Sequence, residues 1–368
     1  MDSISQNKRI LPLDGWRAIA ALGVLWIHAW TYCQNPSFRM AGMDVYKMIS
    51  ILGNGVDLFF VISGFCLFLV LHEKPVNRQT YFSFLRKRWW RIAPAFYIAA
   101  VVMLGCSGEL LSGTGVYKLL SNFLFLHDLL PGTGISYPFW SLAVEFHFYI
   151  LLPLFLLLSR KTGTVAALTY VFGCGLLLNM IFIGDDWRYT LVTKICHFSI
   201  GIYIAYLYVH RIELPSFLSK RTGFFLALAL SFAGRTLMSR SFTGQPDPGG
   251  RLAIAFGPVI MTMGFGWMIL NSISYPPIGK VFANKLFLFY GRISYSFYLW
   301  HAFILGYAGV WLHPYLQYGK YDPLILFVVT LIIVTPLSYL SWFLLERLYF
   351  NKKKNEAISY SDKSSYPV

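Results

Sequence analysis

Long apolar stretches separated by short polar ones recur along the whole sequence. A helix of about 20 apolar residues is long enough to cross the hydrocarbon of a bilayer. Ten runs of this kind can be delimited, at 11–31, 52–71, 94–112, 139–158, 163–183, 191–209, 222–238, 252–272, 287–308 and 324–345. The pattern therefore predicts an all-α integral membrane protein with about ten transmembrane helices.

An even number of crossings places both termini on the same side of the membrane. With the termini in the cytoplasm, most of the 31 lysines and arginines fall in the inner segments, as the positive-inside rule requires. We expect a multi-pass protein of the cell (inner) membrane, with one transmembrane domain at 1–350 and a disordered cytoplasmic tail at 351–368. The outer segment 113–138 is apolar enough to lie in the interface or to re-enter the membrane.

Composition and charge narrow the class of protein further. The chain is 57% hydrophobic and 13% charged, whereas soluble domains are about 25% charged, which argues against a soluble fold. The net charge of +15 is scattered between apolar runs, so it does not predict a partner nucleic acid. The five cysteines lack metal-ligand spacing, so no metal is expected.

Two ionisable residues of the first run lie on one face of a helix. Arg17 and His28 are 11 residues apart, which corresponds to about three full turns and about 16 Å along the axis. Asp57 begins the second run at a depth similar to that of His28. A carboxylate beside an imidazole is typical of general base catalysis on a hydroxyl. The structural alternatives are a snorkelling arginine, an interfacial histidine and a helix-capping aspartate.

The fourth run carries a polar stripe. Ser141, Glu145 and Tyr149 recur at every fourth position and so share one face of a helix. His147 lies about 200° from Glu145 and cannot share that face. We expect Glu145 to be the site residue and His147 to be a packing residue.

Polar groups also share one face in the ninth run. Ser294, Tyr298 and His301 have the spacing of a single helical face, for which helix packing is the structural alternative. His197 lies in an otherwise apolar part of the sixth run, and we interpret it as a packing residue.

A dense basic cluster lies at 86–94 on the cytoplasmic side. Arg86, Arg88 and Arg91 lie there, with two adjacent tryptophans between the last two of these arginines. A loop that only orients the chain could have this composition. Guanidinium groups beside indoles also suit a polyanionic nucleotide, which could lie there and under Arg17.

These motifs resemble those of the acyltransferase type 3 family of membrane-bound O-acyltransferases. The elements that match, in order along nearly the whole chain, are Arg17 with His28, GVDLFFVISGF at 55–65, RKRWWRIAP at 86–94, FWSLAVEFHFY at 139–149, ISYSFYLWH at 293–301, and Glu346 with Arg347. The family usually has proline after this last pair, whereas here the residue is Leu348.

The resemblance implies transfer of an acyl group, most commonly acetyl, from cytoplasmic acyl-CoA to a hydroxyl of a sugar or surface glycan. It implies that His28 is the catalytic base and that Asp57 and Glu145 organise the reaction centre. Coenzyme A would be held by Arg17, Arg86, Arg88 and Arg91. The expected acceptor-binding residues are Trp140, Ser141, Tyr149, Tyr298 and His301.

Two other classes of protein have similar hydrophobic patterns. A secondary transporter or flippase would also have about ten helices with polar intramembrane groups, but it would couple to an ion gradient and turn over no thioester. An inactive, receptor-like relative would share the fold but would leave the pair of Arg17 and His28 without a purpose.

Overall fold

The computed structural model describes residues 9–182, 189–240, 248–317 and 319–347; the expected tail at 351–368 lies outside these residues. Each of the ten apolar runs falls on a long helix. These helices are α1 (Leu11–Tyr32), α3 (Gly55–Leu71), α4 (Arg78–Cys106), α6 (Trp140–Thr162), α7 (Thr164–Phe182), α8 (Leu191–Val209), α9 (Lys220–Arg240), α10 (Pro248–Ser274), α12 (Lys285–Leu312) and α13 (Asp322–Ser341).

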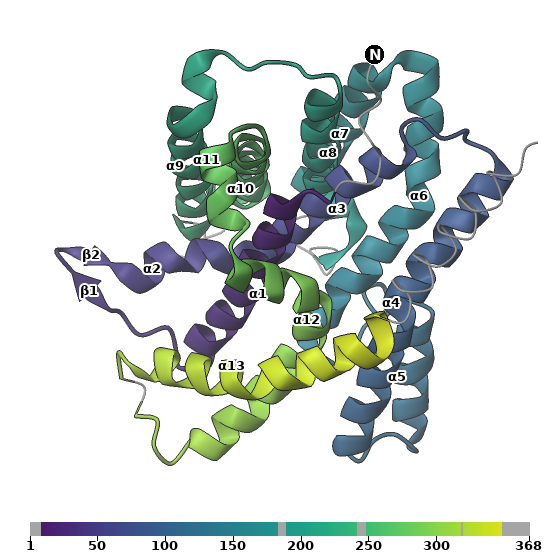
Figure 1. The fold of residues 1–368 in the computed structure, drawn as a ribbon. Helices are drawn as coiled ribbons and strands as arrows, with labels where there is room; N and C mark the ends of the chain where they lie inside the picture. The colour runs from purple at the N-terminus through teal and green to yellow at the C-terminus, as the bar shows by residue number, and fades with distance from the viewer. Residues whose placement is uncertain (1–8, 183–188, 241–247, 318, 348–368) are drawn as a thin grey trace, which may run out of the picture.

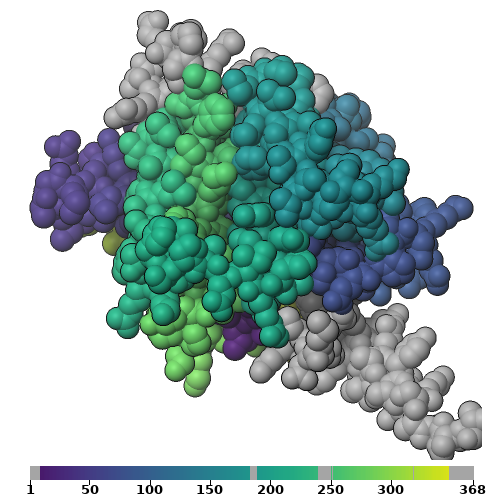
Figure 2. Space-filling view, turned by 90° about the horizontal axis from the view of Figure 1, so that it is seen from above, coloured from purple at the N-terminus to yellow at the C-terminus, as the bar shows by residue number. Residues whose placement is uncertain are grey.

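Short elements connect the long helices. The hairpin of β1 (Arg39–Met40) and β2 (Met43–Asp44) is antiparallel, with Arg39 opposite Asp44. It leads into α2 (Val45–Ile49) and the 3₁₀ turn η1 (Ser50–Asn54), and it stands out at one edge of the body, opposite the start of α4 (Figures 1 and 2). The other short elements are α5 (Gly113–Phe123), η2 (Tyr137–Phe139), η4 (Ser216–Leu218), α11 (Pro276–Phe282) and the π-helical turn η6 (Trp342–Glu346).

Within the described residues, seven helical segments are long and apolar enough to cross a membrane, and they contain α3, α4, α6, α7, α8, α10 and α13. The prediction of a helical, multi-pass membrane protein is therefore confirmed. Helices α1, α9 and α12 are long but less apolar; α1, for example, carries Asp14, Arg17 and His28. The number of ten crossings and the cytoplasmic position of the termini stay predictions.

Helix α1 lies in the middle of the molecule (Figure 1). It packs against α3, α12, α13 and η1. Helices α9, α10 and α11 lie on one side of it, and α4, α5 and α6 on the other (Figure 1). Because other helices surround α1, side chains near both of its ends can face the interior of the protein.

Glycines bring α3 and α8 into close contact. A Cβ atom on Gly201 would lie 2.0 Å from the carbonyl oxygen of Val61, and one on Gly64 would lie 2.2 Å from that of Phe198. Small residues allow membrane helices to approach closely enough for backbone packing. This contact sets the distance between the side chains that the two helices contribute to the site.

The segment 113–138 is folded against the helices beside it. Its buried His127 holds the carbonyl of Phe139 at 2.8 Å from Nε2, and Asn122 donates a hydrogen bond of 2.8 Å to Thr133. Burial lowers the pKa of His127, so its ring is neutral at pH 7. Apolar side chains such as Leu120 and Leu124 remain exposed on α5 and just beyond it.

Candidate active site

Two neighbouring cavities lie between the helices. The larger has a volume of about 630 Å³ and is lined by residues that include His28, Asp57 and Lys194. The smaller has a volume of about 90 Å³ and is lined by residues that include Arg17, Arg88, Arg91, Glu145 and Tyr149. Val56 and Tyr298 line both. A basic cavity and a histidine-containing cavity therefore adjoin each other.

His28 stands in the larger cavity with a free imidazole edge. Its ring centroid lies 5.1 Å from that of His301 and 5.8 Å from that of Tyr137. Among the described residues, His28 has no hydrogen-bond partner. His301 is fully buried, and its Nδ1 lies 2.7 Å from the carbonyl oxygen of Tyr298. Because a carbonyl only accepts, this Nδ1 carries the hydrogen, and Nε2 is left as a buried acceptor without a partner among the described residues.

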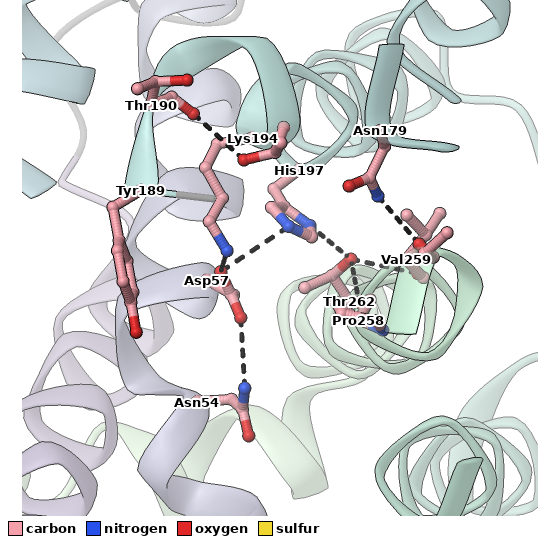
Figure 3. Close-up of polar contacts among 12 residues, drawn as sticks. Asn54, Asp57, Asn179, Tyr189, Thr190, Lys194, His197, Pro258, Val259 and Thr262 are labelled. Carbon is pink, nitrogen blue, oxygen red and sulfur yellow. Dashed lines mark hydrogen bonds and ion pairs between the residues drawn. The ribbon is translucent and has the colours of Figure 1, made fainter. Parts of the chain in front are cut away.

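Asp57 is held by α8 instead of by His28 (Figure 3). Its Oδ1 lies 3.2 Å from Nζ of Lys194 and 3.6 Å from Nε2 of His197, and its Oδ2 accepts a hydrogen bond of 3.2 Å from Asn54. The sequence predicted that Asp57 would orient His28, and this contact is not formed. Asp57 is buried, so it needs the cation of Lys194 as a partner, and α8 supplies one through its close contact with α3.

The interpretation of His197 as a packing residue was incomplete. Its Nδ1 lies 2.9 Å from the hydroxyl oxygen of Thr262, as a packing role requires, but the ring also lines the larger cavity beside Asp57 (Figure 3). Lys194 was not identified from the sequence as a candidate site residue. The signal that could have identified both is their spacing of three residues, which places them on one face of a helix.

Aromatic rings form one wall of the larger cavity. The centroids of Trp140 and Tyr189 are 5.0 Å apart, and the hydroxyl oxygens of Tyr137 and Tyr189 are 3.1 Å apart. The ammonium of Lys194 lies 5.6 Å from the centroid of Trp140. An aromatic wall with polar groups at its edge is typical of sites that bind small polar molecules.

Glu145 lies in the smaller cavity and not beside His28. Its Oε1 accepts hydrogen bonds of 2.6 Å from Ser63 and 2.5 Å from Tyr149. Ser141, Glu145 and Tyr149 all line this cavity, so the stripe predicted for the fourth run is confirmed. The single acidic reaction centre expected from the sequence is instead divided between two cavities.

Tyr298 connects the elements around both cavities. Its hydroxyl lies 2.7 Å from Oγ of Ser141 and 2.7 Å from the carbonyl oxygen of Pro138. Ser294 lines the smaller cavity together with Tyr298, whereas His301 contacts His28. The shared face predicted for the ninth run therefore borders the two cavities.

Three arginines converge on the smaller cavity, and a fourth does not. Arg17 donates to Asp14 at 2.8 Å, and the guanidinium of Arg88 lies 5.7 Å from the ring centroid of Tyr149. Arg91 lines the same cavity. Arg86 is exposed and lines neither cavity, because two helical positions turn it about 200° away from Arg88.

His147 lies away from both cavities. Its Nδ1 is 3.3 Å from Oδ2 of Asp128, whose side chain is fully buried. A buried carboxylate is costly without a partner, so this histidine holds the segment 113–138 against α6, in agreement with the packing role predicted for it. Within the part of the chain that the structure describes, no three His, Cys, Asp or Glu side chains form a group that could hold a metal.

Fold and cavities together define a polytopic membrane protein whose ionisable groups line two internal cavities. The family model described as an acyltransferase domain, that of acyltransferase type 3, matches residues 10–343. The chain therefore belongs to the acyltransferase type 3 family, and the resemblance found in its motifs is confirmed.

Several relatives are named as transferases of acetyl groups. The peptidoglycan O-acetyltransferase OatA of Listeria monocytogenes is 27% identical over 336 residues, 80% of this chain and 49% of that protein. A putative O-acetyltransferase of Staphylococcus aureus (strain COL) is 26% identical over 380 residues, 91% of this chain and 57% of that protein. The chain thus spans about half the length of these two relatives.

A third relative has a length similar to that of this chain. It is a putative acetyltransferase of Acidianus two-tailed virus, 27% identical over 336 residues, 86% of this chain and 90% of that protein. No solved structure matches the chain.

Proposed function

We propose that this protein transfers an acyl group, most simply acetyl, from acyl-CoA in the cytoplasm to a hydroxyl group of a sugar or surface glycan on the outer side. His28 acts as the general base. The observation that carries the proposal is the adjacency of the two cavities, one basic and one containing an unbonded imidazole, with Val56 and Tyr298 lining both.

The smaller cavity suits the arm of a thioester better than a nucleotide. Its volume of about 90 Å³ is below the 300–1,000 Å³ typical of ligand sites. The nucleotide would therefore remain outside this cavity, at its cytoplasmic mouth. Arg17, Arg88 and Arg91, which line the cavity, would neutralise the phosphates from there through charge-assisted hydrogen bonds.

The larger cavity suits the acceptor. Its volume of about 630 Å³ accommodates a sugar residue, and Trp140 and Tyr189 offer apolar faces to the sugar ring. His28 is the base that can act there, because its imidazole is not engaged by another described side chain. Asp57 is engaged by Lys194 and His197, so its role is to shape the cavity.

The reaction follows from these positions. His28 takes the proton of the acceptor hydroxyl while the hydroxyl oxygen bonds to the thioester carbon. The carbon–sulfur bond then breaks, and the departing sulfur receives a proton from the imidazolium. The products are an ester on the acceptor and free coenzyme A. The name of the relative OatA, a peptidoglycan O-acetyltransferase, supports a cell-envelope glycan as the class of acceptor.

Sealed proteoliposomes test this function. Radiolabelled acetyl-CoA is added on the side that the cytoplasmic loops face, and an oligosaccharide acceptor is confined to the other side. We expect labelled ester on the acceptor, release of free coenzyme A, and no dependence on an ion gradient. A product formed only when donor and acceptor share a compartment would refute transfer across the membrane.

The same experiment discriminates a transporter from an enzyme. A secondary transporter or flippase would move unmodified glycan when a gradient is applied and would release no coenzyme A. That result would refute the acyltransferase proposal itself.

A further inference from the structure

Arg235 is a cation in the larger cavity that the reaction above does not use. It lies near the outer end of α9 and lines the cavity together with His28 and Asp57. Its Nε atom is buried and has no hydrogen-bond partner, and none of the ion pairs among the described residues includes it. Burying an N–H donor of a cation without a partner costs free energy, and ionisable groups in such positions mark ligand sites.

The charges of the cavity do not balance. Among the lining residues that the structure describes, Lys194 and Arg235 are cationic and Asp57 is anionic, apart from the imidazoles. The charge of Lys194 is neutralised by Asp57, whose Oδ1 lies 3.2 Å from Nζ of Lys194. The positive charge of Arg235 remains, which favours a ligand that brings one negative charge.

An unused acceptor lies in the wall of the same cavity. Asn179 donates a hydrogen bond of 2.8 Å to the carbonyl of Ala255, but its Oδ1 is buried and unpaired within the described chain. Both residues line the larger cavity, so one offers an unpaired donor and the other an unpaired acceptor. A sugar that carries an acidic group and hydroxyl groups has the complementary chemistry.

We propose that Arg235 binds an anionic group of the acceptor, a carboxylate or a phosphate, so that the protein acts on an acidic glycan. This inference depends on the proposed function, because it places the acceptor in the larger cavity. The planar guanidinium can bind either anion through two parallel hydrogen bonds from its two Nη atoms.

Binding of small glycosides to the full-length protein in lipid nanodiscs tests the proposal. The probes are methyl glucoside, methyl glucuronoside and methyl glucoside 6-phosphate, titrated by ligand-observed NMR without acyl-CoA. We expect at least one acidic glycoside to bind about tenfold or more tightly than the neutral one. Which acidic probe binds more tightly shows whether the group is a carboxylate or a phosphate.

Variants of α9 identify the residue responsible. Arg235→Gln should remove the preference for the acidic probe, and Arg235→Lys should keep part of it because it retains charge without the planar fork. Arg221→Gln is the matched control, because Arg221 is exposed on the same helix and lines neither cavity. Equal binding of neutral and acidic probes by the unmodified protein would overturn the proposal, as would an acidic preference that survives in a folded Arg235→Gln variant.

The test separates this inference from the proposed function. Binding of an acidic probe that depends on Arg235 supports the site even in a preparation that releases no coenzyme A. Efficient acetylation of neutral and acidic acceptors at the same rate would support the acyltransferase and refute a site for an anion.

Discussion

His28 differs from the other histidines near the site because it has ring contacts but no hydrogen bond within the described chain. His301 is bonded to the carbonyl of Tyr298 and its Nε2 is buried. His197 lies between Thr262 and Asp57, and His147 is paired with Asp128. A base must have a nitrogen available for the proton that it removes. This freedom, together with its position beside the basic cavity, favours His28 as the base.

Removing this imidazole should abolish transfer without unfolding the protein. We expect His28→Ala to lower the rate of coenzyme A release by about 10²-fold or more, measured with purified enzyme and a glycan acceptor. His147→Ala is the matched control. It leaves Asp128 buried and unpaired, so it should lower the melting temperature but preserve the rate per folded molecule. The reverse ranking of the two rates would mean that the wrong histidine was chosen.

The arginines of α4 provide a second contrast between neighbouring residues. Arg88→Gln should raise the KM for acetyl-CoA by about tenfold or more, because it removes a charge-assisted hydrogen bond to a phosphate. Arg86→Gln should leave the KM unchanged, because Arg86 is exposed on another face of the helix. Steady-state kinetics at low ionic strength measures both constants. Equal effects of the two substitutions would indicate general electrostatic attraction instead of a site.

At the residue scale, the sequence predicted which side chains share a face of one helix, but not which side chains of different helices meet. The shared face of Ser141, Glu145 and Tyr149 follows from helical periodicity, and the structure has it. The partners of Asp57 come from α8, and periodicity within one helix contains no information about its neighbours. Arg235 was not identified as a site residue, because its position near the end of an apolar run does not reveal a cavity beside it.

Helices α3 and α8 are placed by glycine. A methyl group on Gly201 would lie within 2.0 Å of a backbone oxygen that cannot move independently of α3. We expect Gly201→Ala to separate the helices, to lower the melting temperature and to reduce transfer by weakening the contact of Asp57 with Lys194. Thermal unfolding in detergent and the rate of coenzyme A release measure both effects.

Gly173→Ala on α7 is the control for this prediction. Among the described residues, no atom outside its own helical neighbourhood lies within 4 Å of a Cβ built on Gly173, and alanine favours a helix by about 1 kcal/mol relative to glycine. Its melting temperature should be equal or higher. A Gly201→Ala variant as stable and active as Gly173→Ala would show that the two helices are not held by close packing.

The long helices were predictable because an apolar run of about 20 residues has few other uses. The ends of the helices were less predictable. Helix α4 begins at Arg78, whereas the apolar run in the sequence begins at residue 94. Hydropathy predicts a loop for the basic first half of α4, although these residues form a helix. The turn η2 was not predicted, because contacts with distant residues hold it, such as the bond from Tyr298 to Pro138.

The orientation of the whole molecule stays a prediction from its basic residues. In a variant with the exposed Cys106 and Cys174 changed to Ser, we would introduce Gly134→Cys or Lys161→Cys, both at exposed positions. A membrane-impermeant maleimide applied to intact cells or spheroplasts should label the first and not the second. The opposite pattern would place both termini outside and reverse the proposed direction of transfer.

The boundary that Val56 and Tyr298 form between the two cavities also has a consequence for the energy supply of the cell. A continuous column of water across a membrane conducts protons and would discharge the gradient on which ATP synthesis depends. If the two cavities open toward opposite faces of the membrane, as the proposed function requires, the protein needs a barrier to water where they meet. Val56 and Tyr298 are the side chains at this boundary, and Tyr298 is fixed by hydrogen bonds to Ser141 and Pro138. In the proposed reaction the thioester would displace this barrier only locally, so that catalysis would proceed without a proton leak.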